Sequence, residues 1–250
     1  MSFEVAAEAY ARFMGRYSEP LAVQFADLAQ VRGGQRVLDV GCGPGALTAE
    51  LARRLGPGAV RAVEPSASFA AAARERLPGV EVRQAAAEQL PFPDGAFDAA
   101  LAQLVVHFMT DPVAGLREMA RVTRPGGVVA ACVWDHAGER GPLTVFWRAA
   151  RDTDPGAADE SGLPGTREGQ LAALFRQAGL AGAQATLTVR AGYAAFEDWW
   201  EPFTQGVGPA GDYVRSLPAG RRDRLRARCR DLLPDPPEVT ATAWAVTARA

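Results

Sequence analysis

The sequence predicts an α/β fold in which a doubly wound, mostly parallel sheet of seven strands is covered by helices on both faces. Three observations predict it. Short apolar runs alternate with helical segments between residues 36 and 134, glycine and proline mark most boundaries, and two more strand-like runs follow toward the C-terminus. Apolar runs alternating with helices are typical of buried parallel strands. The 250 residues, 48% of them hydrophobic, suffice for one sizeable core with an appendage.

The first five strands are predicted at apolar runs that end in turn residues: 36–40, 59–64, 80–85, 97–104 and 128–134. The helices between them are predicted at 47–55, 66–77 and 111–122. Ser66 can accept a hydrogen bond at the start of the second of these helices, and Asp111 with Pro112 forms a cap and first-turn pair for the third.

The remaining segments divide the chain into a sheet domain with two helical additions. Residues 1–30 have helical spacing, with Pro20 placed to begin a helix, and are predicted to form an N-terminal helical lid. Thr166 can cap a helix that Gly179 ends. The last two strands are predicted at 183–190 and 239–248, so the sheet domain comprises 31–191 and 237–250, and 192–236 form a helical cap inserted before the last strand.

Charge and cysteine usage exclude several kinds of partner. The formal net charge of −2 provides no field that would draw the chain to nucleic acid or to an anionic membrane. Three cysteines without metal-ligand spacing favour a reducing compartment, and no apolar run approaches the roughly 18 residues of a membrane span. The first residues lack the apolar core of a signal peptide. We therefore expect a cytoplasmic monomer or homodimer with no metal, nucleic-acid or membrane partner.

One arginine-rich segment, 221–230, could suggest a nucleic-acid surface. However, Leu225, Cys229 and Leu232 recur at helical spacing. The segment therefore predicts a helix with one buried face, whose arginines lie on the solvated face.

The most informative feature is the glycine-rich segment at 41–45, which follows the first predicted strand. Glycines at a strand end allow positive φ angles and a close approach of backbone to ligand. The helix that follows offers free N–H groups, and open α/β sheets bind ligands at the carboxyl ends of such strands. A second acid, Glu64, ends the second predicted strand, at the spacing expected for a carboxylate that binds ribose hydroxyls.

Two nucleoside cofactors are compatible with this pattern. Gly41, Gly43 and Ala46 satisfy the dinucleotide fingerprint G-x-G-x-x-A. However, Asp39 would repel a pyrophosphate, and Pro44 removes one N–H from the loop. A sulfonium nucleoside carries positive charge and no phosphate, and an acid beside the loop favours it.

Four segments then resemble the class I S-adenosylmethionine-dependent methyltransferases. Val37 to Gly45 resembles their motif I, and Ala62 to Ser66 resembles their ribose segment. Ala87 to Asp98 (AEQLPFPDGAFD) and Glu118 to Gly127 (EMARVTRPGG) resemble the branch of ubiquinone and menaquinone biosynthesis enzymes. The resemblance covers about residues 10–134, with the matches in the right order. It implies a Rossmann-like methyltransferase fold, with S-adenosylmethionine as cofactor and S-adenosylhomocysteine as product.

The resemblance also implies a cofactor site. Its expected members are Asp39, Gly41, Cys42, Gly43 and Gly45 on the methionine and ribose side, Glu64 at the ribose hydroxyls, Pro65, Ser66, Ala87 and Glu88 around the adenine, and Gln103 facing the methionyl part. The sequence departs from the family at Ala86, where relatives usually have an aspartate that binds the adenine amino group. In relatives the N-terminal helix folds over the cofactor, so Arg16 could pair with the methionyl carboxylate and Tyr17 could lie beside it. Surface placement of Arg16 and core packing of the tyrosines are the alternatives.

Several residues are candidates for contact with the methyl acceptor. His107 follows the fourth predicted strand, where a loop should face the crevice, and could act as a base or be a packed histidine. Asp135 and His136 follow the fifth strand and are expected to be exposed loop residues. The other acceptor-binding candidates are Tyr10, Trp134, Trp199, Trp200 and Phe203, although aromatic residues at such spacing also serve as ordinary core.

The expected function is transfer of a methyl group to a small, partly apolar or aromatic acceptor by in-line displacement. An NAD-dependent oxidoreductase on a related fold and a non-catalytic S-adenosylmethionine-binding protein are the alternatives.

Overall fold

The computed structural model describes residues 7–157, 159–206 and 208–250, with side chains from residue 13 onward. Its strands are β1 (Val37–Val40), β2 (Val60–Val63), β3 (Glu81–Arg83), β4 (Phe97–Gln103), β5 (Thr123–Trp134), β6 (Gly182–Gly192) and β7 (Glu238–Arg249). They form one sheet in the order β3-β2-β1-β4-β5-β7-β6. β7 runs antiparallel to both of its neighbours, and the other pairs are parallel. The predicted seven-stranded, mostly parallel sheet is therefore confirmed.

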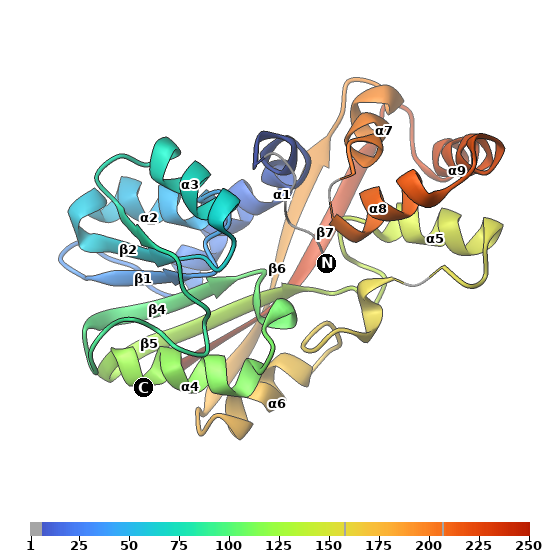
Figure 1. Ribbon diagram of the computed structural model, residues 1–250. Coiled ribbons are helices and arrows are strands. Elements are labelled where there is room, and N and C mark those ends of the chain that lie inside the picture. Colours follow the sequence, from blue (N-terminus) through green and yellow to red (C-terminus); the bar gives the residue numbers. More distant parts are fainter. Residues whose placement is uncertain (1–6, 158, 207) are drawn as a thin grey trace.

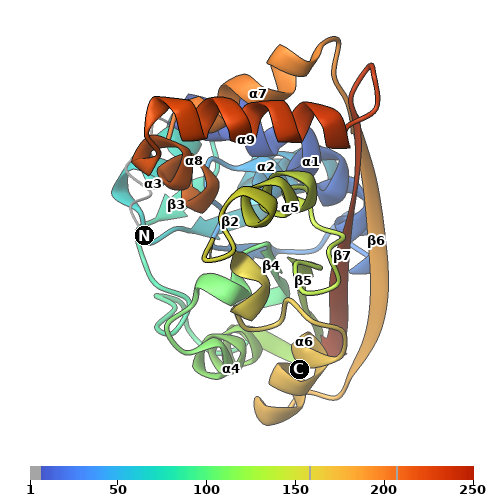
Figure 2. The same ribbon diagram turned by 90° about the vertical axis from the view of Figure 1, so that its right-hand side faces the viewer.

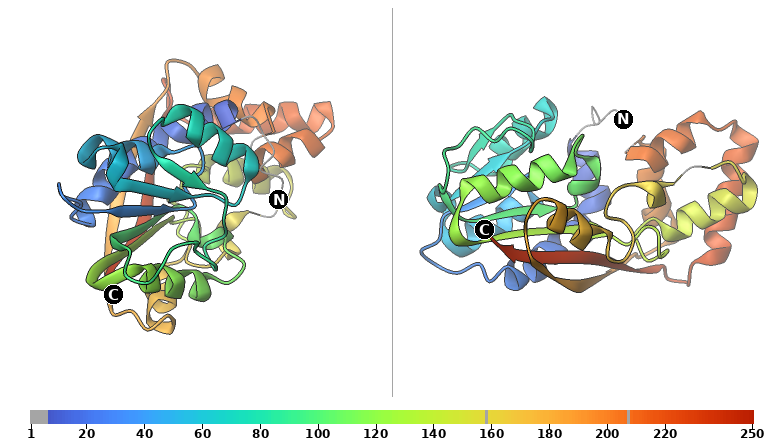
Figure 3. Two further views of the ribbon diagram at one scale, coloured as in Figure 1. Left: turned by 60° about the vertical axis from the view of Figure 1, so that its left-hand side comes forward. Right: turned by 90° about the horizontal axis from the view of Figure 1, so that it is seen from below.

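Helices cover both faces of this sheet and extend beyond one end of it (Figure 1). The α-helices are α1 (Ala7–Leu28), α2 (Ala46–Leu55), α3 (Ala67–Arg76), α4 (Pro112–Val122), α5 (Thr144–Thr153), α6 (Gln170–Gln177), α7 (Phe196–Thr204), α8 (Gly208–Ser216) and α9 (Ala219–Leu232). Short 3-10 helices lie at η1 (Pro57–Ala59), η2 (Val106–Phe108) and η3 (Glu160–Gly162). α1, α2 and α3 lie on one face and α4 and α6 on the other, as Figures 1 and 3 show.

The strands bury side chains on both faces, as apolar runs of a central parallel strand require. In β1, Val37 joins the core beneath α1 and α2, whereas Leu38 joins the core beneath α4 and α6. All four residues of β1 are buried, including Asp39. Burying a carboxylate in a central strand costs free energy of folding. The position of Asp39 near the carboxyl edge of the sheet therefore indicates a ligand-binding site.

Predicted helix starts at Ser66 and Asp111 are confirmed. The Ser66 hydroxyl accepts from the Phe69 N–H, and the Asp111 carboxylate accepts from the N–H groups of Val113 and Ala114. Two other expected starts are wrong. Pro20 lies inside α1, and Thr166 donates its hydroxyl to the carbonyls of the preceding turn while α6 begins four residues later.

Pro20 is tolerated because it lies on the exposed side of α1. Proline removes one helical N–H, and the carbonyl that loses this donor can be hydrated there. The helix therefore continues to Leu28 as one element.

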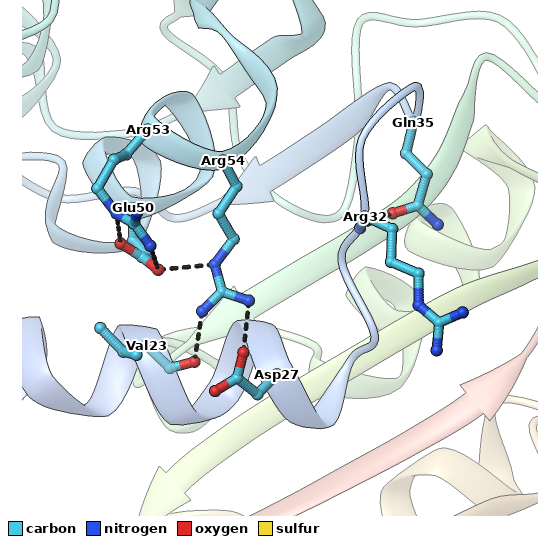
Figure 4. Close-up of polar contacts among 7 residues, drawn as sticks. All are labelled: Val23, Asp27, Arg32, Gln35, Glu50, Arg53 and Arg54. Carbon is cyan, nitrogen blue, oxygen red and sulfur yellow. Dashed lines mark hydrogen bonds and ion pairs between the residues drawn. The ribbon is translucent and has the colours of Figure 1, made fainter.

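The second half of α1 is fastened to α2 through one arginine. Arg54 donates to Glu50 (2.6 Å), to Asp27 (2.6 Å) and to the Val23 carbonyl (3.0 Å), as Figure 4 shows. Gln35, also drawn there, accepts from the Arg32 N–H at 2.7 Å and closes the turn that leads from α1 to β1. The helix predicted as a lid is thus anchored at its C-terminal half.

The segment between β6 and β7 forms α7, α8 and α9, and α9 lies across the outside of this group (Figure 2). α9 packs against α5, so a helix from outside the insert also supports it. Leu225 and Cys229 are fully buried on α9, and its arginines pair with acids of neighbouring helices: Arg226 and Arg230 with Glu197, and Arg228 with Asp152. Within the described chain, no helix is long and apolar enough to cross a bilayer.

We expect Arg54→Ala to destabilise the fold by about 1.5–3 kcal/mol, because hydrogen bonds between charged partners are lost at a side chain that is only 15% exposed. Urea denaturation measures this change. Arg53→Ala is the matched control. Arg53 also pairs with Glu50, but its side chain is 68% exposed, and its loss should change stability far less. Equal effects of the two substitutions would contradict the anchoring role of Arg54.

Candidate functional site

A cavity of about 700 Å³ opens at the carboxyl ends of β1, β2 and β4. Its walls come from the loop after β1, the end of β2 with the start of α3, the loop after β3, the end of β4 and α1. The lining residues are Gly15, Ser18, Glu19, Asp39, Gly41, Cys42, Gly43, Pro44, Ala46, Leu47, Glu64, Pro65, Ser66, Ala67, Ser68, Phe69, Arg76, Ala86, Ala87, Glu88, Gln103, Leu104, Val105, Phe108, Met109 and Thr110. Such an edge is where open α/β sheets place ligands.

The loop after β1 is shaped by glycines with positive φ. Gly41, Gly43 and Gly45 have φ angles of 72°, 52° and 92°. The N–H groups of Gly41 and Cys42 both donate to the Val63 carbonyl, at 2.9 and 3.0 Å, so the loop is tied to β2. A Cβ on Gly41 would lie 2.3 Å from Val105 Cγ2, and the loop therefore fits against the β4 side only without a side chain there.

Asp39 is 1% exposed and only partly paired. Its Oδ2 accepts from the Thr48 hydroxyl at 2.6 Å, and its Oδ1 has no hydrogen-bond partner among the described residues. Burial raises the pKa of this carboxyl from 3.8 to about 7, the nearby Glu64 carboxylate adds to the rise, and the Thr48 hydrogen bond opposes it. A buried acid with a spare oxygen favours a cationic ligand in the cavity.

Glu64 is held in place from both sides. Its Oε2 accepts from the Gly43 N–H at 2.8 Å, and its Oε1 accepts from the Ser66 N–H at 2.9 Å. Burial raises the pKa of Glu64, and the two backbone hydrogen bonds oppose that rise. Each carboxylate oxygen can accept a further hydrogen bond, so the fixed group can bind a pair of ligand hydroxyls.

Part of the cavity lining is apolar. It includes Ala86 and Ala87 in the loop after β3, and Met109, which like Ala87 lies next to Gly115. Glu88 Oε1 accepts from the Asp111 N–H at 3.1 Å, which ties the loop after β3 to the start of α4. A flat ring can lie against such a wall, and polar recognition of its edge falls to backbone groups or to Glu88 because position 86 has no polar side chain.

The end of β4 connects the sheet to α1. Gln103 Nε2 donates to the Ser18 carbonyl at 3.0 Å, while Gln103 Oε1 is buried without a partner among the described residues. The next residue, Leu104, has a φ of 60°, which is strained for a branched side chain. Strained backbone of this kind gathers at functional sites, and here it borders the cavity.

The structure thus brings most of the expected cofactor residues together around one cavity. Gly45 is the exception within the loop, since it does not line the cavity and instead packs against Leu77. Arg16 and Tyr17 lie elsewhere as well. Arg16 is exposed, donates to the Gly192 carbonyl and stacks over the Tyr193 ring, whereas the buried Tyr17 hydroxyl pairs with the Tyr193 hydroxyl at 2.6 Å.

Neither of the two histidines lines the cavity. His107 is 4% exposed and does not line the cavity, although its neighbour Phe108 does. Burial, with a contribution from His136, lowers the pKa of His107 to about 3, so this ring is neutral at physiological pH and weakly basic. His136 lies 6.1 Å from it between ring centroids and is partly buried, with a pKa lowered to about 4 by burial. The expected exposure of Asp135 is wrong, because this residue is 1% exposed and paired with Arg140 at 2.6 Å.

The expected acceptor-binding aromatics with described side chains are packed into the core. Phe203 stacks on Phe146 with ring centroids 4.5 Å apart, and Trp199 lies 4.8 Å from Phe203. Trp200 stacks on Phe196, and Trp134 meets Tyr17 edge to face. None of the four expected residues at 134, 199, 200 and 203 lines the cavity. The side chain of Tyr10 lies outside the described part of the structure.

Several lining residues were not expected from the sequence. They are Gly15, Ser18 and Glu19 on α1, Leu47 on α2, Ala67, Ser68, Phe69 and Arg76 on α3, and Leu104, Val105, Phe108, Met109 and Thr110 after β4. Helical spacing offered a signal for two of these groups, since Gly15, Ser18 and Glu19 share a face of α1, as do Phe69 and Arg76 of α3. It could not show that these faces border a cavity.

Among the described residues, no group of three or more His, Cys, Asp and Glu side chains is arranged to hold a metal ion. The cavity instead combines two fixed carboxylates, a glycine loop and an apolar wall. This arrangement suits a ligand with positive charge, neighbouring hydroxyl groups and a flat ring.

Comparison with known proteins identifies relatives over most of the chain. Residues 38–131 match the family described as methyltransferase domain. An uncharacterized methyltransferase of Mycobacterium sp. (strain JLS) is 34% identical over 216 residues, which cover 82% of this chain and 85% of that protein. The ubiquinone/menaquinone biosynthesis C-methyltransferase of Hahella chejuensis is 41% identical over 108 residues, which cover 40% of this chain and 43% of that protein.

Solved structures are similar in fold. The YcgJ protein of Bacillus subtilis superposes with a TM-score of 0.59 at 20% identity, covering 93% of this chain and 97% of that chain.

We expect Gly41→Ala to destabilise the protein by about 2–4 kcal/mol, because the new Cβ meets Val105 and the backbone has a φ of 72°. Thermal and urea unfolding measure the effect. Gly33→Ala is the control, since a Cβ there meets nothing within 4 Å, and it should leave stability nearly unchanged. Val105→Ala, added to Gly41→Ala, should restore part of the loss; the absence of any rescue would contradict the steric explanation.

Proposed function

Because this chain belongs to the class I S-adenosylmethionine-dependent methyltransferases, we propose that it methylates a small, partly apolar or aromatic acceptor. The observation that carries the proposal is the convergence of two buried carboxylates, Asp39 and Glu64, on the glycine loop within one cavity.

The residues present fit the cofactor group by group. The sulfonium and ammonium groups are cations, and Asp39 Oδ1 is a buried oxygen without a partner among the described residues. The ribose carries two neighbouring hydroxyls, and Glu64 retains acceptor capacity at both oxygens. A Cβ on Gly43 would meet nothing within 4 Å, so the loop leaves open space at this point. A dinucleotide fits less well, because its pyrophosphate would lie beside both acids.

When bound, the cofactor supplies a methyl group already activated for transfer. The role of the protein is then to hold the acceptor in line with that group. Holding two reactants in this geometry can lower the activation free energy by roughly 7–11 kcal/mol. Gln103 and Ser18 connect the sheet to α1 at the edge of the cavity, so α1 can exclude water from the reacting atoms.

The acceptor class follows from the apolar part of the lining. Leu104, Val105 and Phe108 lie within five residues of one another after β4, next to the end of the strand that carries Gln103. We propose that this apolar segment contacts the acceptor, and that the cap aromatics Trp199, Trp200 and Phe203, which are packed against other core rings and do not line the cavity, do not bind it.

The proposed chemistry relies on positioning and uses no imidazole base. His107 is buried, does not line the cavity and has a pKa lowered to about 3, and the described lining contains no histidine. An acceptor that is already nucleophilic at neutral pH is therefore favoured.

We expect Glu64→Gln to weaken S-adenosylmethionine binding by about 10- to 100-fold, because an amide accepts at one atom only and loses the charge-assisted bonds to the ribose and to the Gly43 and Ser66 N–H groups. Isothermal titration calorimetry measures the affinity. Glu81→Gln is the matched control, since Glu81 is a 42% exposed side chain on β3 outside the cavity. Unchanged affinity in Glu64→Gln would refute the proposed ribose contact.

We expect S-adenosylmethionine affinity to rise by about tenfold from pH 6 to pH 8. In the free protein the pKa of Asp39 is about 7, and a bound cation favours the ionised carboxylate, so binding below this pKa must release a proton. The Glu64 carboxylate and the Thr48 hydroxyl are the neighbours that modulate this pKa.

Titrations in buffers of different ionisation enthalpy count the released protons. In Asp39→Asn the pH dependence should be lost together with part of the affinity. A wild-type affinity that falls between pH 6 and pH 8 would contradict the role of Asp39.

A further inference from the structure

One positively charged side chain stands among the acids of the cavity. Among the described lining residues, the carboxylates are Glu19, Asp39, Glu64 and Glu88, and Arg76 is the one guanidinium. S-adenosylmethionine also carries charges of both signs, with two cations and a single carboxylate. The four acids match the cations and none of them can bind the carboxylate.

Arg76 already binds a carboxylate in this structure. Its guanidinium, at the end of α3, pairs with the Glu19 carboxylate, in the middle of α1, at 2.7 Å. The two helices are in contact (Figure 1). Both side chains line the cavity and are partly exposed, Arg76 at 39% and Glu19 at 54%. A pair of this exposure is weakly held and can be exchanged for another carboxylate at small cost.

The end of α3, which carries Arg76, lies beside the N-terminal turn of α2. The residue that follows it, Leu77, packs so closely against Gly45 that a Cβ there would lie 2.7 Å from Leu77 Cδ1. Gly45 caps α2, and the first residues of that helix, Ala46 and Leu47, line the cavity. The first N–H groups of a helix lack intrahelical partners, and its positive end favours an anion.

We propose that Arg76 binds the carboxylate of the methionyl part of the cofactor, together with the N-terminal turn of α2, by exchanging its contact with Glu19. The inference rests on the proposed function and assigns a residue to the one anionic group of the ligand. Arg16, expected from the sequence for this role, is directed to Gly192 and Tyr193 instead. Glu19 then acts as a competitor that holds Arg76 at the cavity until the cofactor arrives.

The test compares two ligands that differ only in this group, S-adenosylmethionine and decarboxylated S-adenosylmethionine. Calorimetry gives both dissociation constants for the wild type, for Arg76→Ala and for Arg16→Ala. The wild type should prefer the carboxylated ligand by about tenfold, and Arg76→Ala should abolish that preference while binding the decarboxylated ligand as before. Binding of the decarboxylated ligand also shows that the variant is folded.

Two further variants sharpen the result. Arg76→Lys should retain part of the preference, since an ammonium keeps the charge but loses the planar pair of donors. Glu19→Gln should tighten binding of the carboxylated ligand by about two- to threefold, because the competing carboxylate is gone.

Each outcome has a distinct meaning. A preference that survives in Arg76→Ala, or that is lost in Arg16→Ala instead, overturns the inference and leaves the methyltransferase assignment standing. If the wild type binds neither ligand, the proposed function fails first.

Discussion

The structure depends on the burial of two carboxylates at the carboxyl ends of neighbouring parallel strands. Asp39, one residue before the end of β1, is 1% exposed, and Glu64, directly after β2, is 6% exposed. Buried acids are costly unless hydrogen bonds or positive charge compensate them. The Thr48 hydroxyl of α2, the Gly43 N–H of the glycine loop and the Ser66 N–H at the start of α3 compensate part of this cost. Both side chains line the cavity, and their remaining capacity to accept hydrogen bonds determines which ligand groups the cavity can bind.

The C-terminal half of α1 makes fixed contacts with α2, whereas the middle of α1 makes a surface ion pair that can be exchanged. Its C-terminal half is fastened to α2 by Arg54, whose side chain is largely buried. Its middle meets the cavity through Ser18, which receives the Gln103 side chain, and Glu19, which pairs with Arg76 at the surface. The same helix can therefore hold its place against the sheet and still change partners where the ligand binds.

Packing assigns several chemically attractive residues to structural roles. Trp199 and Phe203 bury large rings in a cluster that joins α5, α7 and α1, and His107 loses its basicity by being enclosed. Each has the chemistry of a functional residue, but function also requires access to the cavity. Arg76, by contrast, has no motif around it and acquires its role from where α3 ends.

The sequence by itself determined the alternation of strands and helices, the glycine loop and the two acids beside it. These features are local: a strand end, a turn with positive φ and a carboxylate lie within a few residues of one another, and the chain direction of parallel strands brings their carboxyl ends to one edge. Only the tertiary structure decided which faces of α1 and α3 border the cavity, that Arg16 turns away and that the cap aromatics are core. Those outcomes depend on packing between elements far apart in the chain, and helical spacing specifies which residues share a face but not what that face meets.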